Sequence, residues 1–277
     1  MIAASTLMLA GCDELQLAGD PVQDALDAVT ASDEAGLNEI MMTVADPEEA
    51  IAYFRRMSAN EPENLDHKRA LAASLIRGDR ASEAVTVLSK IVNSDAGTDA
   101  DRVNLVDALV RAGQWDAAHE VMQQVSDAHQ TYQRYKLEAM IADARENWEE
   151  ADSFYETAAG LTMQPAAILN NWGYSNLIRG NFADAEVLFQ EAIRQNGRLL
   201  TAKNNLILAR SAQRKYDLPV MPMSQTERAE LIYTLALTAI KNGDVQIGKG
   251  LLREAVDSHP QYFEAAARSL AALEGSN

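Results

Sequence analysis

The sequence predicts an all-α fold built from a stack of helical hairpins, and three observations lead to this prediction. Small residues recur at a period of about 34 residues, which is typical of stacked supersecondary units. Glycine and proline are sparse, with 14 glycines and 7 prolines in 277 residues, and they fall between the expected helices. Clusters of β-branched residues with period two, which would indicate strands, are absent. The recurring small residues are Ala50, Ala84, Ala118, Ala151 and Ala185.

A bulky apolar residue follows each of these alanines at position i+4. Residues at i and i+4 lie on one face of a helix, so each pair marks a packed face. The expected partner is the preceding helix of the same hairpin, as a period of this length requires. The bulky residues are Phe54, Leu88, Met122, Tyr155 and Phe189.

The clearest copy of the repeat lies between Ala166 and Leu199. Two amphipathic helices are expected in it, separated at Gly180, because glycine adopts the turn conformation without steric cost. Gly173 and Ala185 are the small residues at the helix crossing. They let the two axes approach within about 8–10 Å, and Phe189 then fills the groove beside them.

This small and large pattern resembles the tetratricopeptide repeat (TPR) family. The resemblance implies a right-handed superhelical solenoid of helical hairpins, in which the first helix of each hairpin lines the concave wall. Weaker copies precede the clearest one, and Val106 stands where a small residue is usual. The residues that carry the resemblance best are Trp172, Gly173, Gly180, Phe182, Ala185, Phe189 and Ala192.

After Leu199 the repeat loses its phase. One more helix is expected over 201–215, and Pro219 and Pro222 then exclude a helix interior, which leaves a hinge or an extended strap. A capping box from Ser224 to Glu227 predicts the next helix start. The expected organisation is an array over 31–215 of about five repeats plus one extra helix, a proline-containing linker over 216–223, and a TPR-like hairpin with a capping helix over 224–277.

The N-terminal residues are similar to a bacterial lipoprotein signal. The single cysteine, Cys12, follows the apolar run MIAASTLMLAG, as in a lipobox, where the thiol becomes lipidated after cleavage. No Lys or Arg precedes the run, whereas signal peptides usually open with positive charge. We expect a signal peptide over 1–11, an acidic tether over 12–30, and a lipid anchor in the bacterial cell envelope. Asp13 does not decide between the inner and the outer membrane.

The net charge of -17 argues against nucleic acid as a partner, because phosphate binding needs a basic surface. Acidic helix faces of this kind keep a protein soluble. We therefore expect protein partners.

No catalytic or metal-binding constellation is found in the sequence, so neither an enzyme activity nor a cofactor is expected. His67, His119, His129 and His259 lack the i, i+4 pairing of a helical metal site. The acidic stretch from Asp95 to Asp101 lacks the alternating ligands, the central glycine and the closing glutamate of a calcium loop. We interpret it as a turn with a helix cap. An unrecognised hydrolase site is the remaining enzymatic hypothesis, and it would need convergent titratable groups in a cleft.

The resemblance places a binding groove on the first helices. Asn170–Asn171 and Asn204–Asn205 are one repeat apart, so their amides should stack in adjacent layers, where they either bind a peptide backbone or only order the stack. Basic residues on this wall would suit a segment with some negative charge. The expected groove residues are Arg69, Asn104, Arg111, Lys136, Met140, Asn170, Asn171, Tyr174, Asn204 and Asn205, with Arg77 and Asp107 on the same wall.

Together, the lipobox, tether, repeats and C-terminal extension resemble the TadD-type lipoproteins of tight-adherence (Flp) pilus assembly. This resemblance implies a membrane-anchored scaffold whose partner is a pilus secretin or another assembly component. The alternative is a TPR lipoprotein that assists outer-membrane protein assembly or recruits cell-wall enzymes.

Overall fold

A computed structural model describes residues 35–275 of the chain. Within this range the regular structure is helical and contains no strand, so the all-α prediction is confirmed. The expected signal peptide, the tether and Cys12 lie outside the described residues.

The chain divides into two compact units between Val87 and Leu88, inside helix α4 (Ala81–Val92). The described part of the first unit contains helical residues 35–43, α2 (Pro47–Asn60), α3 (Leu65–Arg77) and the start of α4. Asp46 caps α2, and its side chain accepts a hydrogen bond from the backbone N–H of Glu48. Such caps satisfy amide groups that have no partner within the helix.

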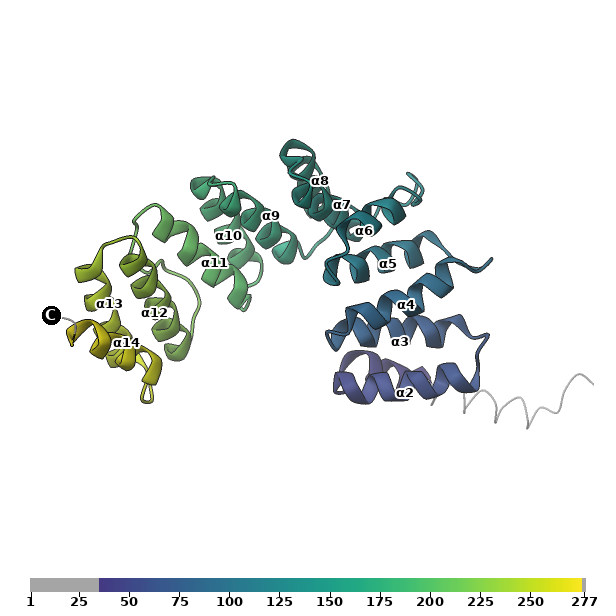
Figure 1. Cartoon of the computed structure of the whole chain (residues 1–277), viewed down its shortest axis with the longest axis horizontal. Coiled ribbons are helices and arrows are strands. Elements are labelled where there is room, and N and C mark those ends of the chain that lie inside the picture. Colours follow the sequence, from purple (N-terminus) through teal and green to yellow (C-terminus); the bar gives the residue numbers. More distant parts are fainter. Residues whose placement is uncertain (1–34, 276–277) are drawn as a thin grey trace, which may run out of the picture. The chain divides into compact units, whose positions relative to one another are not determined.

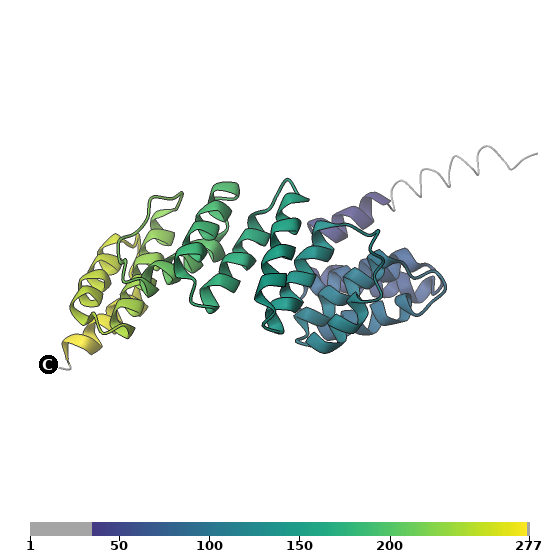
Figure 2. The same cartoon turned by 90° about the horizontal axis from the view of Figure 1, so that it is seen from above.

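The second unit continues with hairpins in which α5 packs on α6, α7 on α8, α9 on α10, and α12 on α13. Figures 1 and 2 show α9, α10 and α11 side by side. The helices are α5 (Asp99–Arg111), α6 (Trp115–Met122), α7 (Tyr132–Ala144), α8 (Trp148–Gly160), α9 (Ala166–Ile178), α10 (Phe182–Gln195), α11 (Leu200–Ala212), α12 (Gln225–Lys241), α13 (Val245–Ser258) and α14 (Glu264–Glu274).

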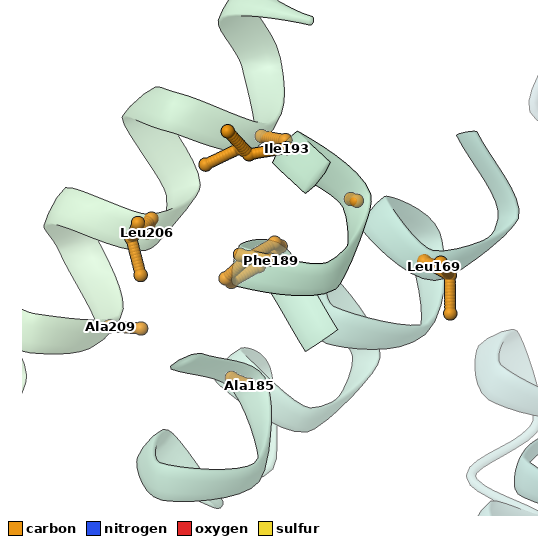
Figure 3. Packing of buried hydrophobic residues seen from close by; sticks show 8 residues of the cluster. Leu169, Ala185, Phe189, Ile193, Leu206 and Ala209 are labelled. Atoms are coloured by element: carbon orange, nitrogen blue, oxygen red, sulfur yellow. The ribbon is translucent and has the colours of Figure 1, made fainter. Parts of the chain in front are cut away.

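The helix crossing between α9 and α10 depends on Gly173. A Cβ atom added at this glycine would lie 2.7 Å from Cε1 of Phe189, which is closer than side chains pack. Phe189 is completely buried, and in Figure 3 it lies between the helix of Leu169 and the helix of Leu206. Burial of such a side chain contributes about 1.5–3 kcal/mol. The prediction that Gly173 is a point of close approach is confirmed.

The first helices of the hairpins end in one recurring turn. A residue with positive φ follows the helix, and the next N–H donates back to the last turn, as when Asn181 donates to the Asn176 carbonyl at 2.9 Å. This is the Schellman arrangement, which satisfies helix-terminal carbonyls. Arg214 adopts the same conformation after α11, so α11 ends as a first helix does. The residues with positive φ are Asp79, Gly113, Glu146, Gly180, Arg214 and Gly243.

A non-helical strap over 216–223 replaces the second helix that would have followed α11. Leu218, Met221 and Met223 pack against the buried apolar cluster of α11 and α12. Polar contacts hold the start of the strap, where Tyr216 donates to Asp244 at 2.6 Å. The strap therefore belongs to the packed body of the second unit.

The start of α12 is tied to α11 by one buried cation. Lys203 is 1% exposed, and its Nζ lies 3.1 Å from Oε1 of Glu227. Glu227 also completes a capping box with Ser224, which confirms the predicted helix start. A buried Lys203 without its partner would cost several kcal/mol, about 3–5. Glu227 must therefore stay beside Lys203, and this requirement holds the start of α12 against α11.

Candidate functional site

A groove of about 530 Å³ opens on the second unit along α7, α9 and α11. Its walls combine amide groups with aromatic and aliphatic side chains, which is typical of binding clefts. The residues that line it are Trp115, Met140, Asp143, Ala144, Tyr155, Asn170, Asn171, Tyr174, Ile178, Thr201, Asn204 and Asn205.

The structure brings most of the expected groove residues together at this place. Met140 comes from α7, the pair Asn170–Asn171 and Tyr174 from α9, and the pair Asn204–Asn205 from α11. Second helices contribute as well, with Trp115 from α6 and Tyr155 from α8. Whether these residues bind a partner stays a prediction.

The asparagines form a ladder across adjacent layers. Asn205 Nδ2 donates to Asn170 Oδ1 at 3.1 Å, and Asn171 Nδ2 donates to Met140 Sδ at 3.7 Å. The predicted stacking of amides between layers is therefore confirmed, and part of their capacity serves the stack itself. Asn204 makes no side-chain hydrogen bond to any residue within 35–275, so its amide can meet an occupant of the groove.

Asp143 lies in the wall of the groove and has two hydroxyl donors. Tyr155 donates to Oδ2 at 2.8 Å, and Ser175 donates to Oδ1 at 2.5 Å. Partial burial raises the pKa of Asp143, and the two hydrogen bonds oppose this shift without cancelling it. Burial and the neighbouring carboxylate also raise the pKa of Tyr155, which keeps its hydroxyl protonated as a donor.

A second carboxylate, Asp152 of α8, lies outside the groove, and its surroundings shift its pKa in the opposite direction to that of Asp143. Arg179 holds it through two hydrogen bonds of 2.6 and 2.9 Å, and Trp172 donates its indole N–H at 2.7 Å. Burial raises the pKa of Asp152, but these hydrogen bonds outweigh burial and bring the pKa below its usual value. The guanidinium of Arg179 also lies over the ring of Trp148, 5.5 Å from its centre. This cluster locks α9 onto α8.

The cations expected on the wall of the first unit are engaged within that unit. Arg69 lies 2.9 Å from the carboxylate of Asp66 on the same helix. The guanidinium of Arg77 donates to the backbone carbonyls of Met41 and Ala45 at 2.8 and 3.0 Å. Arg77 therefore caps the helix that ends at residue 43, and its charge is used in the fold.

The cations expected on α5 and α7 share one carboxylate. Arg111 Nε donates to Asp107 at 2.8 Å, and Lys136 Nζ lies 3.8 Å from the same side chain. Burial lowers the pKa of Lys136, and the negative charge of Asp107 offsets part of this shift. Lys136 lines a separate hollow between α7, the loop that follows α8 and the start of α9, and Asn104 accepts a hydrogen bond from Gln133 at 3.3 Å. None of these residues lines the groove of α7, α9 and α11, so the reason for expecting an anionic segment there is removed.

Several groove residues were missed by sequence reasoning. Tyr155 was interpreted as a core position and is 2% exposed, yet it also lines the groove. Ile178, which is 57% exposed, lines the groove as well. Trp115 also lines the groove and was not among the expected groove residues. Asp143 and Thr201 gave a usable signal, because each lies on a first helix at i±3 from a predicted groove residue.

The acidic stretch before α5 is a helix cap, as predicted. Thr98 and Asp101 form a capping box in which each side chain accepts from the backbone N–H of the other. Within residues 35–275, no group of His, Cys, Asp or Glu side chains is arranged to hold a metal ion. In the same range no helix has the length and apolar character needed to cross a bilayer.

No family model matches the sequence, and no curated protein matches it. Solved structures do match. A chain of the APC/C hetero-tetramer Cut9–Hcn1 is similar with a TM-score of 0.60 and 16% identity over 86% of this chain, which spans 48% of that chain. A tetratricopeptide repeat protein from Parabacteroides merdae has a TM-score of 0.51 and 11% identity over 91% of this chain and 97% of its own.

The type IV pilus biogenesis factor PilW is similar with a TM-score of 0.55 and 16% identity. The match covers 74% of this chain and 97% of PilW. At these identities the likeness concerns the fold alone. The described residues therefore have the fold of tetratricopeptide repeat proteins.

Asp152→Asn should lower the melting temperature at neutral pH by about 2–4 °C. The pKa of Asp152 is lower in the folded state, so its stabilisation is present above the unfolded-state pKa and is lost as the pH falls through the folded one. In thermal melts between pH 7 and pH 3, the difference in melting temperature between Asp152→Asn and wild type should disappear below a pH of about 4. The control is Asp116→Asn, which removes a 99% exposed carboxylate 3.8 Å from Arg145 and should have little effect. A gap that stays constant over the whole pH range would contradict this assignment.

Proposed function

We propose that the protein is an interaction scaffold that holds a segment of another protein in the groove of α7, α9 and α11. The observation that carries this proposal is the groove itself, where amides of two successive layers stand beside exposed apolar side chains. Tyr174 is 51% exposed and Ile178 is 57% exposed, although both belong to well-packed helices. Exposed apolar residues gathered in a cleft favour a binding role.

The hydrogen-bonding capacity of the groove fits a polypeptide backbone. Asparagine both donates and accepts, as a peptide group does. Asn204 and the acceptor oxygen of Asn205 remain available after the ladder has formed. An extended segment lying across α9 and α11 would meet these amides in succession, and its side chains would enter the apolar part of the groove.

We further propose that the scaffold works in the bacterial cell envelope, anchored by a lipid on Cys12, and that it serves assembly of the tight-adherence (Flp) pilus. The lipobox-like residues before Cys12 support the anchor. The resemblance to TadD-type lipoproteins supports the pilus assignment. The likeness in fold to PilW, a type IV pilus biogenesis factor, agrees with it.

Ile178→Glu should weaken partner binding by at least about tenfold, because the occupant would desolvate a carboxylate that lacks a partner. The measurement is photo-crosslinking in the source cells from a photoreactive residue at position 174, followed by mass spectrometry. The matched control is Val187→Glu on α10, since Val187 is 60% exposed and lies outside the groove. One dominant crosslinked envelope protein, lost in Ile178→Glu and kept in Val187→Glu, is the expected result.

The identity of the crosslinked protein separates the functions. A pilus secretin or another pilus assembly protein agrees with the proposal, whereas a cell-wall enzyme or an outer-membrane assembly factor favours the alternative. Crosslinks that are equal in both variants would refute the role of the groove.

Cys12→Ser should move the protein from the membrane fraction to the soluble fraction. Each buried CH₂ of an acyl chain contributes about 0.8 kcal/mol to membrane binding, so loss of the acyl chains removes the anchor. Cell fractionation with metabolic palmitate labelling measures both effects. Retention of the variant in the membrane fraction, or wild-type protein without label, would rule out the lipid anchor.

A further inference from the structure

The groove of α7, α9 and α11 contains a carboxylate. Among the described residues that line it, Asp143 is the one acidic residue, and none is Lys or Arg. The chain as a whole carries a net charge of -17, so the surrounding field is also negative. An acidic segment would therefore meet repulsion, while a basic one would be attracted.

Four cations of the helices that carry the groove are paired with carboxylates outside it. They belong to α7, to α11 and to the C-terminal end of α9, and each lies within an ion pair. None of them lines the groove, although Arg179 attracts the carboxylate of Asp143 from outside it. The pairs are Lys136–Asp107, Arg179–Asp152, Lys203–Glu227 and Arg210–Glu186.

Asp143 keeps acceptor capacity for an occupant. Each of its oxygens accepts one hydrogen bond, from Ser175 or from Tyr155. A carboxylate oxygen has two lone pairs, so each can accept a second hydrogen bond. The two hydroxyl donors also fix the carboxylate in place, so a cation that binds it loses little free energy in ordering the acceptor.

Aromatic rings and an apolar wall complete the recognition. Tyr174 and Trp115 line the same groove and are 51% and 37% exposed, and a guanidinium or ammonium group can stack on such rings. Ile178 and Met140 offer apolar contact to a neighbouring side chain. The carboxylate and the aromatic rings of the groove thus suit a cation, and its aliphatic wall suits an apolar side chain.

We propose that the occupant is an extended segment with a lysine or arginine next to a large apolar residue, and that acidic segments are rejected. This inference rests on the proposed function, since it specifies the chemistry of the partner at the same groove. It reverses the charge that the sequence alone suggested. The negative charge of Asp143 is complementary to a cation of the occupant. Lys136 and Arg179 on the same helices are already paired with other carboxylates.

The first test is selection of peptides from a random phage-displayed library on the whole chain, with counter-selection on Ile178→Asn, which removes the apolar contact without adding a charge to the groove. The counter-selection removes peptides that bind elsewhere. Groove-dependent peptides enriched in Lys or Arg beside a large apolar residue are the expected result. Groove-dependent peptides that are acidic or show no charge bias would overturn the inference and leave the proposed function standing. A selection with no groove-dependent peptide would overturn both.

The second test measures the affinity of a selected basic peptide for Asp143→Asn. A hydrogen bond to a charged group is lost, so the affinity should fall about tenfold. The matched control is Glu156→Gln, which removes the same charge from an exposed position on α8. Because salt screens exposed charges, this control should leave the affinity within about twofold of wild type.

Far-ultraviolet circular dichroism and a thermal melt check that Asp143→Asn is folded. If the variant fails to fold, the selected peptide is instead made with norleucine in place of its cation, and the wild-type protein should bind it about tenfold more weakly. Equal affinity of wild type and folded Asp143→Asn, or equal affinity for both peptides, would overturn the inference.

Discussion

The close approach of helices at small residues is the constraint on which the rest of the structure depends. At Gly173 there is no room for a Cβ atom, because the ring of Phe189 occupies that space. At Gly248 the backbone carbonyl of Ala236 would lie 3.0 Å from an added Cβ. Beside Gly173 the large residue at the contact, Phe189, is fully buried, and packing as close as this makes the hairpin a rigid layer. The alanines of the repeat, such as Ala151 and Ala185, are completely buried for the same reason.

Rigid layers explain why the groove has the residues that it has. The helices α7, α9 and α11 all line the groove, so equivalent positions of these successive first helices come into register. Asn170 and Asn205 meet in this way and hydrogen-bond across layers. The same register places Asp143 of α7 against Ser175 of α9. Polar side chains of the wall therefore serve the stack and remain partly available to an occupant.

Much of the fold could be predicted from the sequence because the repeat makes local signals add up. The small residue at Gly173 and the capping box at Ser224 were both predicted and found. The recurring turn was visible only at the positions with glycine. Asp79 and Glu146 adopt the same positive φ without being glycine, so their sequence carried no sign of it. Tertiary packing imposes that conformation at some cost.

The charge of the candidate site could not be predicted in the same way. Arg77 and Lys136 were placed on the correct helices, but their partners lie far away in the sequence or in the backbone. A repeat pattern says where a side chain emerges, and it does not say which carboxylate neutralises it. The position of Asp143 on a first helix could be read from the sequence, but its two hydroxyl donors, Tyr155 of the same hairpin and Ser175 of the next layer, could not.

The most direct test of the packing constraint compares two glycines of α13 by urea unfolding. An added methyl group at Gly250 meets open space, and alanine is the better helix former, so Gly250→Ala should raise the free energy of unfolding by up to about 1 kcal/mol. Gly248→Ala should lower it, because the methyl group meets Ile240 and the Ala236 carbonyl. If Gly248→Ala stabilises the protein as Gly250→Ala does, the helices do not meet as closely as this account requires.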